Sequence, residues 1–251
     1  MDTFDSPFVV LVVALATQWL AAYAGDLLHT KIRPLRDDER ADFDVVRAAT
    51  LTLLGLIIGF SFAMAVSRYD QRKNYEEAEA NAIGTEYLRV DFLPAEHAGR
   101  VRELLRQYVE QRIAFYLARG ERQVAQINAD TEKVQAELWQ TIVRAVTPQQ
   151  TPVGALVVAG MNDVLNSQGY TQAAWWNRIP VAAWGLMGLV AIACNLLFGY
   201  GGRHAGALLL ILPVIVSVAF FLIADIDSPR GGVIRVSPQN LIALSKTMTP
   251  H

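Results

Sequence analysis

The sequence predicts an all-α membrane protein with four transmembrane helices and a helical-bundle domain inserted between helices 2 and 3. Apolar residues make up 53% of the 251 residues although 18% are charged, so the apolar residues must be concentrated in stretches. Four such stretches carry no formal charge, and each has the about 20 residues that a helix needs to cross a bilayer. They are Ser6–Gly25, Ala48–Ser67, Ile179–Gly202 and Ala205–Ala224.

These stretches divide the chain into four parts. Residues 1–67 hold the first transmembrane pair with a charged loop at 26–47, and residues 68–178 form a polar block that we interpret as a soluble stalk and bundle. Residues 179–224 hold the second pair, and residues 225–251 form a juxtamembrane tail. Acidic rather than basic residues precede the first stretch, which favours a retained helix over a cleaved signal peptide.

The second apolar stretch is predicted to continue into the polar block as one helix. Glycine and proline are absent between Phe60 and Gly84, and the intervening residues are good helix formers. A single helix from about Arg47 to about Leu93 follows, and Pro94 would end it. Its second half would stand outside the bilayer as a stalk.

Three further helices are expected in the block because apolar residues recur there at helical spacing. Packing of these stripes within one bundle is the simpler interpretation, and a seam shared between subunits is the alternative. The stripes are Val101, Leu104, Leu105 and Tyr108; then Val124, Ile127, Thr131, Val134, Leu138 and Ile142; then Val153, Leu156, Val157, Met161, Val164 and Leu165.

Charge and residue usage exclude several functions. The block from Arg68 to Arg178 carries 13 basic and 14 acidic residues, interleaved rather than clustered, which argues against nucleic acid and against a polybasic lipid-binding patch. The single cysteine, Cys194, and four scattered histidines predict neither a metal site nor a cofactor. Motifs of the common catalytic sites are missing, so we do not expect an enzyme.

The basic residues near the spans do not decide which side of the membrane holds the bundle. Four spans put both termini and the bundle on one side, and the basic residues near the spans are equally divided between the two sides. Those on the loop side are Lys31, Arg33, Arg36, Arg40, Arg47 and Arg203, and those on the bundle side are Arg68, Arg72, Lys73, Arg178, Arg230 and Arg235.

Small residues follow one face of the second span. Their spacing of about four residues allows close helix packing in lipid, and the alternative is a face that lines a pore, narrowed by neighbouring aromatic rings. The candidate pore-lining residues are Thr52, Gly55, Gly59, Phe60, Phe62, Ala63 and Ser67.

The end of the last span is unusual because two carboxylates, Asp225 and Asp227, directly follow an apolar run. Carboxylates at a membrane boundary are often functional. Three interpretations are open: a helix end with Asp227 as a turn residue, an ion site, or a salt bridge to Arg230 or Arg235. Helix-breaking and turn residues follow, namely Pro229, Gly231, Gly232, Ser237 and Pro238.

The tail Leu222–Leu244 resembles the end of the bestrophin-like family of uncharacterised bacterial membrane proteins, which closes its last span with D-x-P-x-x-G-x-x-x-V-S-P. The exit of span two is similar as well, and Tyr69-Asp70 resembles an aromatic-Asp pair that follows the pore helix of bestrophins. The matching residues are Asp227, Pro229, Gly232, Val236, Ser237 and Pro238 in the tail, with Glu79, Glu86 and Leu93-Pro94 in the stalk.

The resemblance implies a homopentameric channel whose second helix lines an apolar neck and whose large domain is cytoplasmic. Our leading hypothesis is an oligomeric ion channel or pore in a bacterial inner membrane, in contact with lipid and with ions as possible ligands. The alternative is a non-conducting membrane scaffold or sensor whose helical domain binds a partner.

Overall fold

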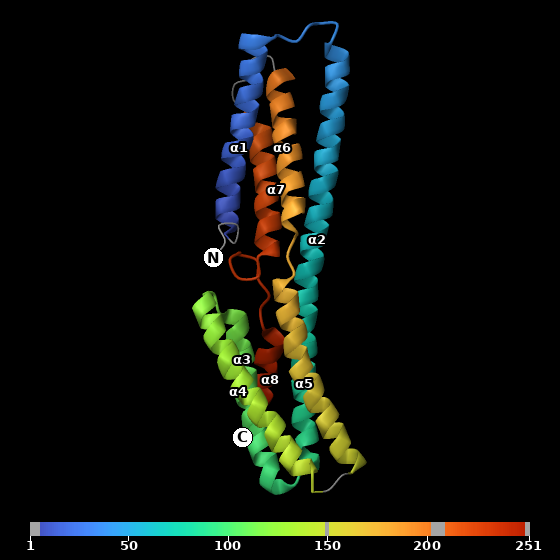
Figure 1. The fold of residues 1–251 in the computed structure, drawn as a ribbon, viewed down its shortest axis with the longest axis vertical. Coiled ribbons are helices and arrows are strands. Elements are labelled where there is room, and N and C mark those ends of the chain that lie inside the picture. The colour runs from blue at the N-terminus through green and yellow to red at the C-terminus, as the bar shows by residue number, and fades with distance from the viewer. Residues whose placement is uncertain (1–5, 149–150, 202–208, 249–251) are drawn as a thin grey trace. The chain divides into compact units, whose positions relative to one another are not determined.

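The computed structural model describes residues 6–148, 151–201 and 209–248, and this part of the chain is built from helices (Figure 1). The all-α class is therefore confirmed. The helices are α1 (Pro7–Leu27), α2 (Arg40–Arg89), α3 (Ala95–Leu117), α4 (Glu121–Val146), α5 (Pro152–Trp176), α6 (Val181–Gly201), α7 (Ile211–Asp227) and α8 (Gln239–Thr247), with a π-helical turn at Leu28–Ile32 and a 3₁₀ turn at Val90–Phe92.

The helices form two compact units. Unit 1 comprises Met1–Arg68 and Arg178–Arg235, and unit 2 comprises Tyr69–Asn177 and Val236–His251. Unit 1 therefore contains α1, α6, α7 and the first half of α2, whereas unit 2 contains the second half of α2 with α3, α4, α5 and α8. The four-part division made from the sequence stays an interpretation.

Helix α2 is continuous over 50 residues, which confirms the single helix predicted through the second span and the stalk. At 1.5 Å per residue it is about 75 Å long. The 3₁₀ turn that follows α2 ends at Leu93, which adopts extended backbone angles (φ −82°, ψ 155°), as a residue before proline prefers.

One stripe of α2 is buried along most of the helix. Its residues recur at steps of three, four or seven, so they lie on one face. The stripe is apolar or small up to Ala65 and mostly charged from Arg72 onward. Its members are Leu54, Ser61, Ala65, Arg72, Glu76, Glu79, Ile83, Glu86 and Val90.

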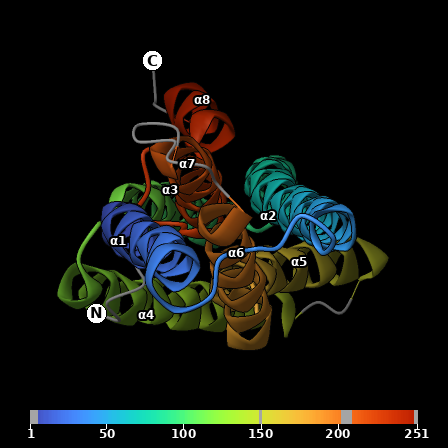
Figure 2. The same ribbon diagram turned by 90° about the horizontal axis from the view of Figure 1, so that it is seen from above.

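In unit 1, α1 lies beside α6 and α7, as both views show (Figures 1 and 2). Glycines allow the close approach of α1 and α6. A Cβ on Gly25 would collide with the carbonyl oxygen of Leu196, and a Cβ on Gly199 would collide with the carbonyl oxygen of Ala22. The small residues that bring these helices together are thus in α1 and α6.

Three helical stretches are long and apolar enough to cross a membrane, namely Pro7–Lys31, Arg40–Phe92 and Pro152–Gly201. They contain the first predicted span from Pro7 onward, the whole of the second, and the third as far as Gly201. Helix α7 has 17 residues, of which Ile211–Ala224 belong to the fourth predicted span. The first four residues of that span lie outside the described residues. The count of four spans therefore remains a prediction.

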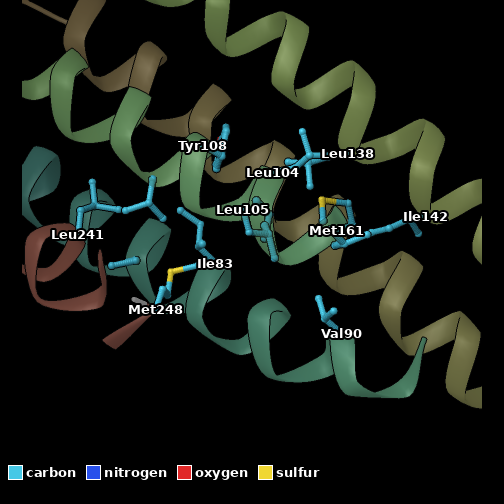
Figure 3. Packing of buried hydrophobic residues seen from close by; sticks show 14 of the residues in the cluster. Ile83, Val90, Leu104, Leu105, Tyr108, Leu138, Ile142, Met161, Leu241 and Met248 are labelled. Carbon is cyan, nitrogen blue, oxygen red and sulfur yellow. The ribbon is translucent and has the colours of Figure 1, made fainter. Parts of the chain in front are cut away.

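Unit 2 has a hydrophobic core to which all its helices contribute (Figure 3). Leu104, Leu105 and Tyr108 of α3 are fully buried, which confirms the first predicted stripe. Leu138 and Ile142 of α4 and Met161 of α5 meet them in the same cluster, with further residues from α2 and α8.

Candidate functional site

The seven pore-lining candidates of α2 are all exposed in unit 1. Phe60 is 66% and Phe62 42% exposed. A Cβ added to Gly55 or Gly59 would meet no described atom within 4 Å. The buried stripe through Leu54 lies on the opposite side of the helix, so this face is free for contacts outside the described chain.

The exposed face of α2 also contains residues that the sequence analysis did not select. Leu56 is 54% exposed and lies between Thr52 and Gly59 at heptad spacing. Beyond Ser67 the face becomes polar at the same three- and four-residue steps, and this part of the helix belongs to unit 2. The polar continuation consists of Asp70, Asn74, Glu77 and Asn81, all exposed.

Asp225 holds the turn that follows α7. It is 1% exposed, and its two carboxylate oxygens accept the backbone N–H groups of Val233 at 2.7 Å and Ile234 at 2.8 Å. A Cβ on Gly232 would collide with the carbonyl oxygen of Asp225, so the turn requires glycine there. Asp225 thus has the turn-forming role that the sequence suggested for Asp227.

Asp227 connects the end of α7 to the segment that precedes α6. Its Oδ2 accepts the backbone N–H of Ile179 at 3.0 Å, and its Oδ1 lies 3.5 Å from Nη1 of Arg68. The sequence did not indicate Arg68 as a partner. Both Asp225 and Asp227 bind protein groups, and the described residues contain no group of three His, Cys, Asp or Glu that could hold a metal.

The remaining motif residues form the connection to α8. The N–H of Gly231 donates to Ser228 Oγ at 3.1 Å, which closes the turn that contains Pro229. The carbonyl of Ser237 accepts from Gln239 at 2.9 Å, and Pro238 is the residue before α8.

Three buried polar side chains meet among α1, α6 and α7, and sequence reasoning missed them. Gln18 Nε2 donates to Ser217 Oγ at 3.3 Å, and Asn195 Nδ2 donates to Gln18 Oε1 at 3.1 Å. Their sequence separations of 199 and 177 residues left no local signal. Buried polar groups between apolar helices form hydrogen bonds to one another because lipid offers none.

In unit 2, the stalk residue Glu79 belongs to a buried ion cluster. Its carboxylate forms an ion pair with Arg112 of α3 and accepts from Thr171 of α5 at 3.2 Å and from Tyr116 at 3.5 Å. Burial alone would lower the pKa of Arg112, but the charge and hydrogen bond of Glu79 together with the neighbouring Tyr108 and Tyr116 outweigh burial, and the pKa is raised. Burial also raises the pKa of Tyr116.

Other stalk residues have different surroundings. Tyr69 packs partly buried against the core of unit 2, while Asp70 is exposed. Glu86 is fully buried, and neither of its oxygens has a hydrogen-bond partner in the described chain.

Glu76, which sequence reasoning missed, holds the start of α8. Its Oε1 accepts the backbone N–H of Leu241 at 3.0 Å, and its Oε2 accepts Nδ2 of Asn240 at 2.6 Å. At the other end of α8, Arg106 Nε donates to the carbonyl of Met248 at 2.6 Å. Unit 2 therefore fixes both ends of the C-terminal helix.

Comparisons with known proteins place these features in a family. The sequence profile described as the Bestrophin-like domain matches residues 16–241. None of the curated proteins matches the sequence.

Among solved structures, a bacterial bestrophin homologue from Klebsiella pneumoniae matches with a TM-score of 0.63 at 16% identity, over 96% of this chain and 95% of that chain. A tryptophan-to-alanine variant of the homologue matches with a TM-score of 0.64 at 14% identity, over 95% and 93%. At such identities the likeness shows a shared fold. Together with the profile match, it means that this chain is a membrane protein that belongs to the bestrophin-like family.

Proposed function

We propose that the protein is an oligomeric ion channel or pore of a bacterial inner membrane, with α2 lining the path. One observation carries the proposal: the face of α2 that holds Thr52, Gly59, Ala63 and Ser67 is exposed, while the opposite face is buried. In a symmetric ring with α2 nearest the axis, this face would meet its copies around a common path.

The residues on this face suit a conducting path. Small side chains leave room at the axis, while Leu56 and Phe60 would narrow the path to an apolar neck. The proposal includes four spans and a homo-oligomer, five-membered by analogy with the family. A transport role rather than a catalytic one is supported by the family membership.

Single-cysteine accessibility in liposomes tests the path. In a Cys194→Ala background, cysteines are placed at Thr52, Gly59 and Ser67 and treated with a water-soluble charged thiol reagent while ion flux is recorded. Leu189→Cys on α6, an exposed position outside α2, is the matched control. We expect the reagent to reduce flux at the three α2 positions and to leave the control unchanged.

Oligomer mass distinguishes the channel from the non-conducting scaffold. A ring of defined mass with reagent-sensitive flux supports the proposal. A defined assembly without flux would favour the scaffold, and equal inhibition at Leu189 and at Thr52 would remove α2 from the path.

A further inference from the structure

Glu86 is a buried carboxylate that belongs neither to the turn at Asp225 nor to the ion cluster at Glu79. It lies on the buried stripe of α2 within unit 2 and is 0% exposed. Neither Oε1 nor Oε2 has a hydrogen-bond partner in the described chain. An ionised carboxylate in such surroundings lacks the hydrogen bonds that normally compensate for lost water, whereas a neutral acid is tolerated.

Helix α5 closes directly over this carboxylate. A Cβ on Gly160 would collide with Oε2 of Glu86 and with Nη1 of Arg89, so any larger residue at 160 would require both side chains to move. Glycine at this position therefore allows the α5 backbone to lie against the acid.

The charged groups that face Glu86 compensate for its negative charge only in part. Arg89, one turn further along α2, has its Nη1 3.8 Å from Oε2 of Glu86, beyond hydrogen-bond distance, and its side chain is 31% exposed. From α5, Asp163 contributes a second negative charge. Burial raises the pKa of Glu86 to about 8, Arg89 lowers the pKa, and Asp163 raises it.

We propose that Glu86 is a proton-binding site that controls the packing of α5 on α2. With the proton bound, the neutral acid lies dry beneath Gly160. When the proton leaves, the carboxylate needs water or a closer approach of Arg89, and either requires the contact at Gly160 to loosen. Because α2 also carries the proposed path, coupling of this site to conduction rests on the proposed function.

The sign of the pH dependence follows from proton linkage. The pKa in the folded protein, about 8, exceeds its ordinary value of 4.5. Between these two values the folded state holds more protons than the unfolded state, so stability falls as pH rises through this window. Where the folded state holds one proton more than the unfolded state, the unfolding equilibrium constant rises by about tenfold per pH unit. Above the folded pKa both states have lost the proton, and the stability no longer changes with pH because of Glu86.

The test uses the full-length protein in lipid nanodiscs. Urea unfolding is followed by pulse proteolysis within unit 2 from about pH 5 to about pH 9. Glu86→Gln removes the titrating group at nearly constant shape, Glu86→Met is a second neutral variant, and Glu77→Gln removes an exposed carboxylate from the same helix as the control. Infrared spectra of the wild type record the protonated carboxyl band.

We expect wild type and Glu77→Gln to lose stability as pH rises, and Glu86→Gln to lack this component. The wild-type carboxyl band should persist at neutral pH, disappear near pH 8, and be missing from Glu86→Gln and Glu86→Met. An unchanged slope in Glu86→Gln, or a wild-type spectrum without the band at about pH 6, would overturn the proton site.

Flux in liposomes separates this inference from the proposed function. A wild-type flux that changes with pH, and loses that change in Glu86→Gln, supports coupling of the site to the path. If wild type and Glu86→Gln differ in the pH dependence of stability but no variant conducts ions, the channel is contradicted and the proton site is still supported. If the flux does not change with pH although the stability difference between wild type and Glu86→Gln is present, the coupling is contradicted and the proton site is not.

Discussion

Glu79 and Glu86 lie seven residues apart on the same buried face of α2, and both are fully buried. Glu79 has Arg112, Tyr116 and Thr171 around its carboxylate, whereas the oxygens of Glu86 accept no hydrogen bond in the described chain. Residue type, helix and burial are the same. The difference teaches that the facing helices, and not burial alone, determine which charge state a buried carboxylate can hold.

The facing residues explain why the two sites diverge. Opposite Glu79, α3 supplies a long cationic side chain that also lies over the ring of Phe115, with its guanidinium carbon 4.5 Å from the ring centre. Opposite Glu86, α5 supplies Gly160, which has no side chain to donate a hydrogen bond. Glu79 is therefore paired with a charged side chain, whereas the carboxylate of Glu86 lies against the backbone of α5.

The largest expected effect comes from removing the partner of Glu79. Arg112→Met would leave a buried, uncompensated carboxylate, so the free energy of unfolding should fall by about 3–5 kcal/mol. Denaturant unfolding of unit 2 measures it. Arg100→Met, which removes the exposed pair with Glu137, is the control and should cost about 1 kcal/mol or less.

A double variant sharpens this prediction. Glu79→Gln combined with Arg112→Met removes both charges, and it should be more stable than Arg112→Met alone because no unpaired charge stays buried. If the double variant and Arg112→Met were equally stable, the unpaired charge of Glu79 would not be the reason why Arg112→Met loses stability.

Filling the space over Glu86 should have a smaller effect. Gly160→Ala places a methyl group against the Glu86 carboxylate and the Arg89 guanidinium, and overpacking of this kind costs about 1–3 kcal/mol. Gly169→Ala on the same helix meets no described atom within 4 Å and should stabilise α5 by up to about 1 kcal/mol. If both variants unfolded alike, the close approach at Gly160 would be refuted.

Asp225 extends the comparison to a carboxylate held by backbone groups. Asp225→Ala leaves the N–H groups of Val233 and Ile234 without their acceptors, at a cost of about 1–2 kcal/mol. Limited proteolysis between Ser228 and Arg235 should accelerate. Asp225→Asn, which keeps one acceptor oxygen, should fall between wild type and alanine; wild-type cleavage of Asp225→Ala would show that the turn does not need the carboxylate.

Much of the fold could be read from local sequence. Charge-free stretches mark the helices of unit 1, and the lack of glycine and proline between Phe60 and Gly84 accounts for the length of α2. The stripe through Leu104 and Tyr108 was correctly placed in the core because helical spacing is a local property. That α2 lines a path stays a prediction, although its candidate residues are exposed.

The candidate site was less predictable because its partners are far apart in sequence. Glu79 and Glu86 were both selected, but through a resemblance that treated them alike. The sequence analysis considered a turn role for Asp227 only, and only the folded tail shows that the N–H groups of Val233 and Ile234 reach Asp225.

The sequence by itself determined the helical class, the apolar stretches and the continuity of α2, because each depends on residues within a few turns of one another. The tertiary structure alone decided that Arg112 reaches Glu79 from 33 residues away, that Gly160 covers Glu86, and that Gly25 and Gly199 bring α1 and α6 together. Such pairings depend on which helix faces meet, and the free energy of burying a charge depends on what the facing helix provides.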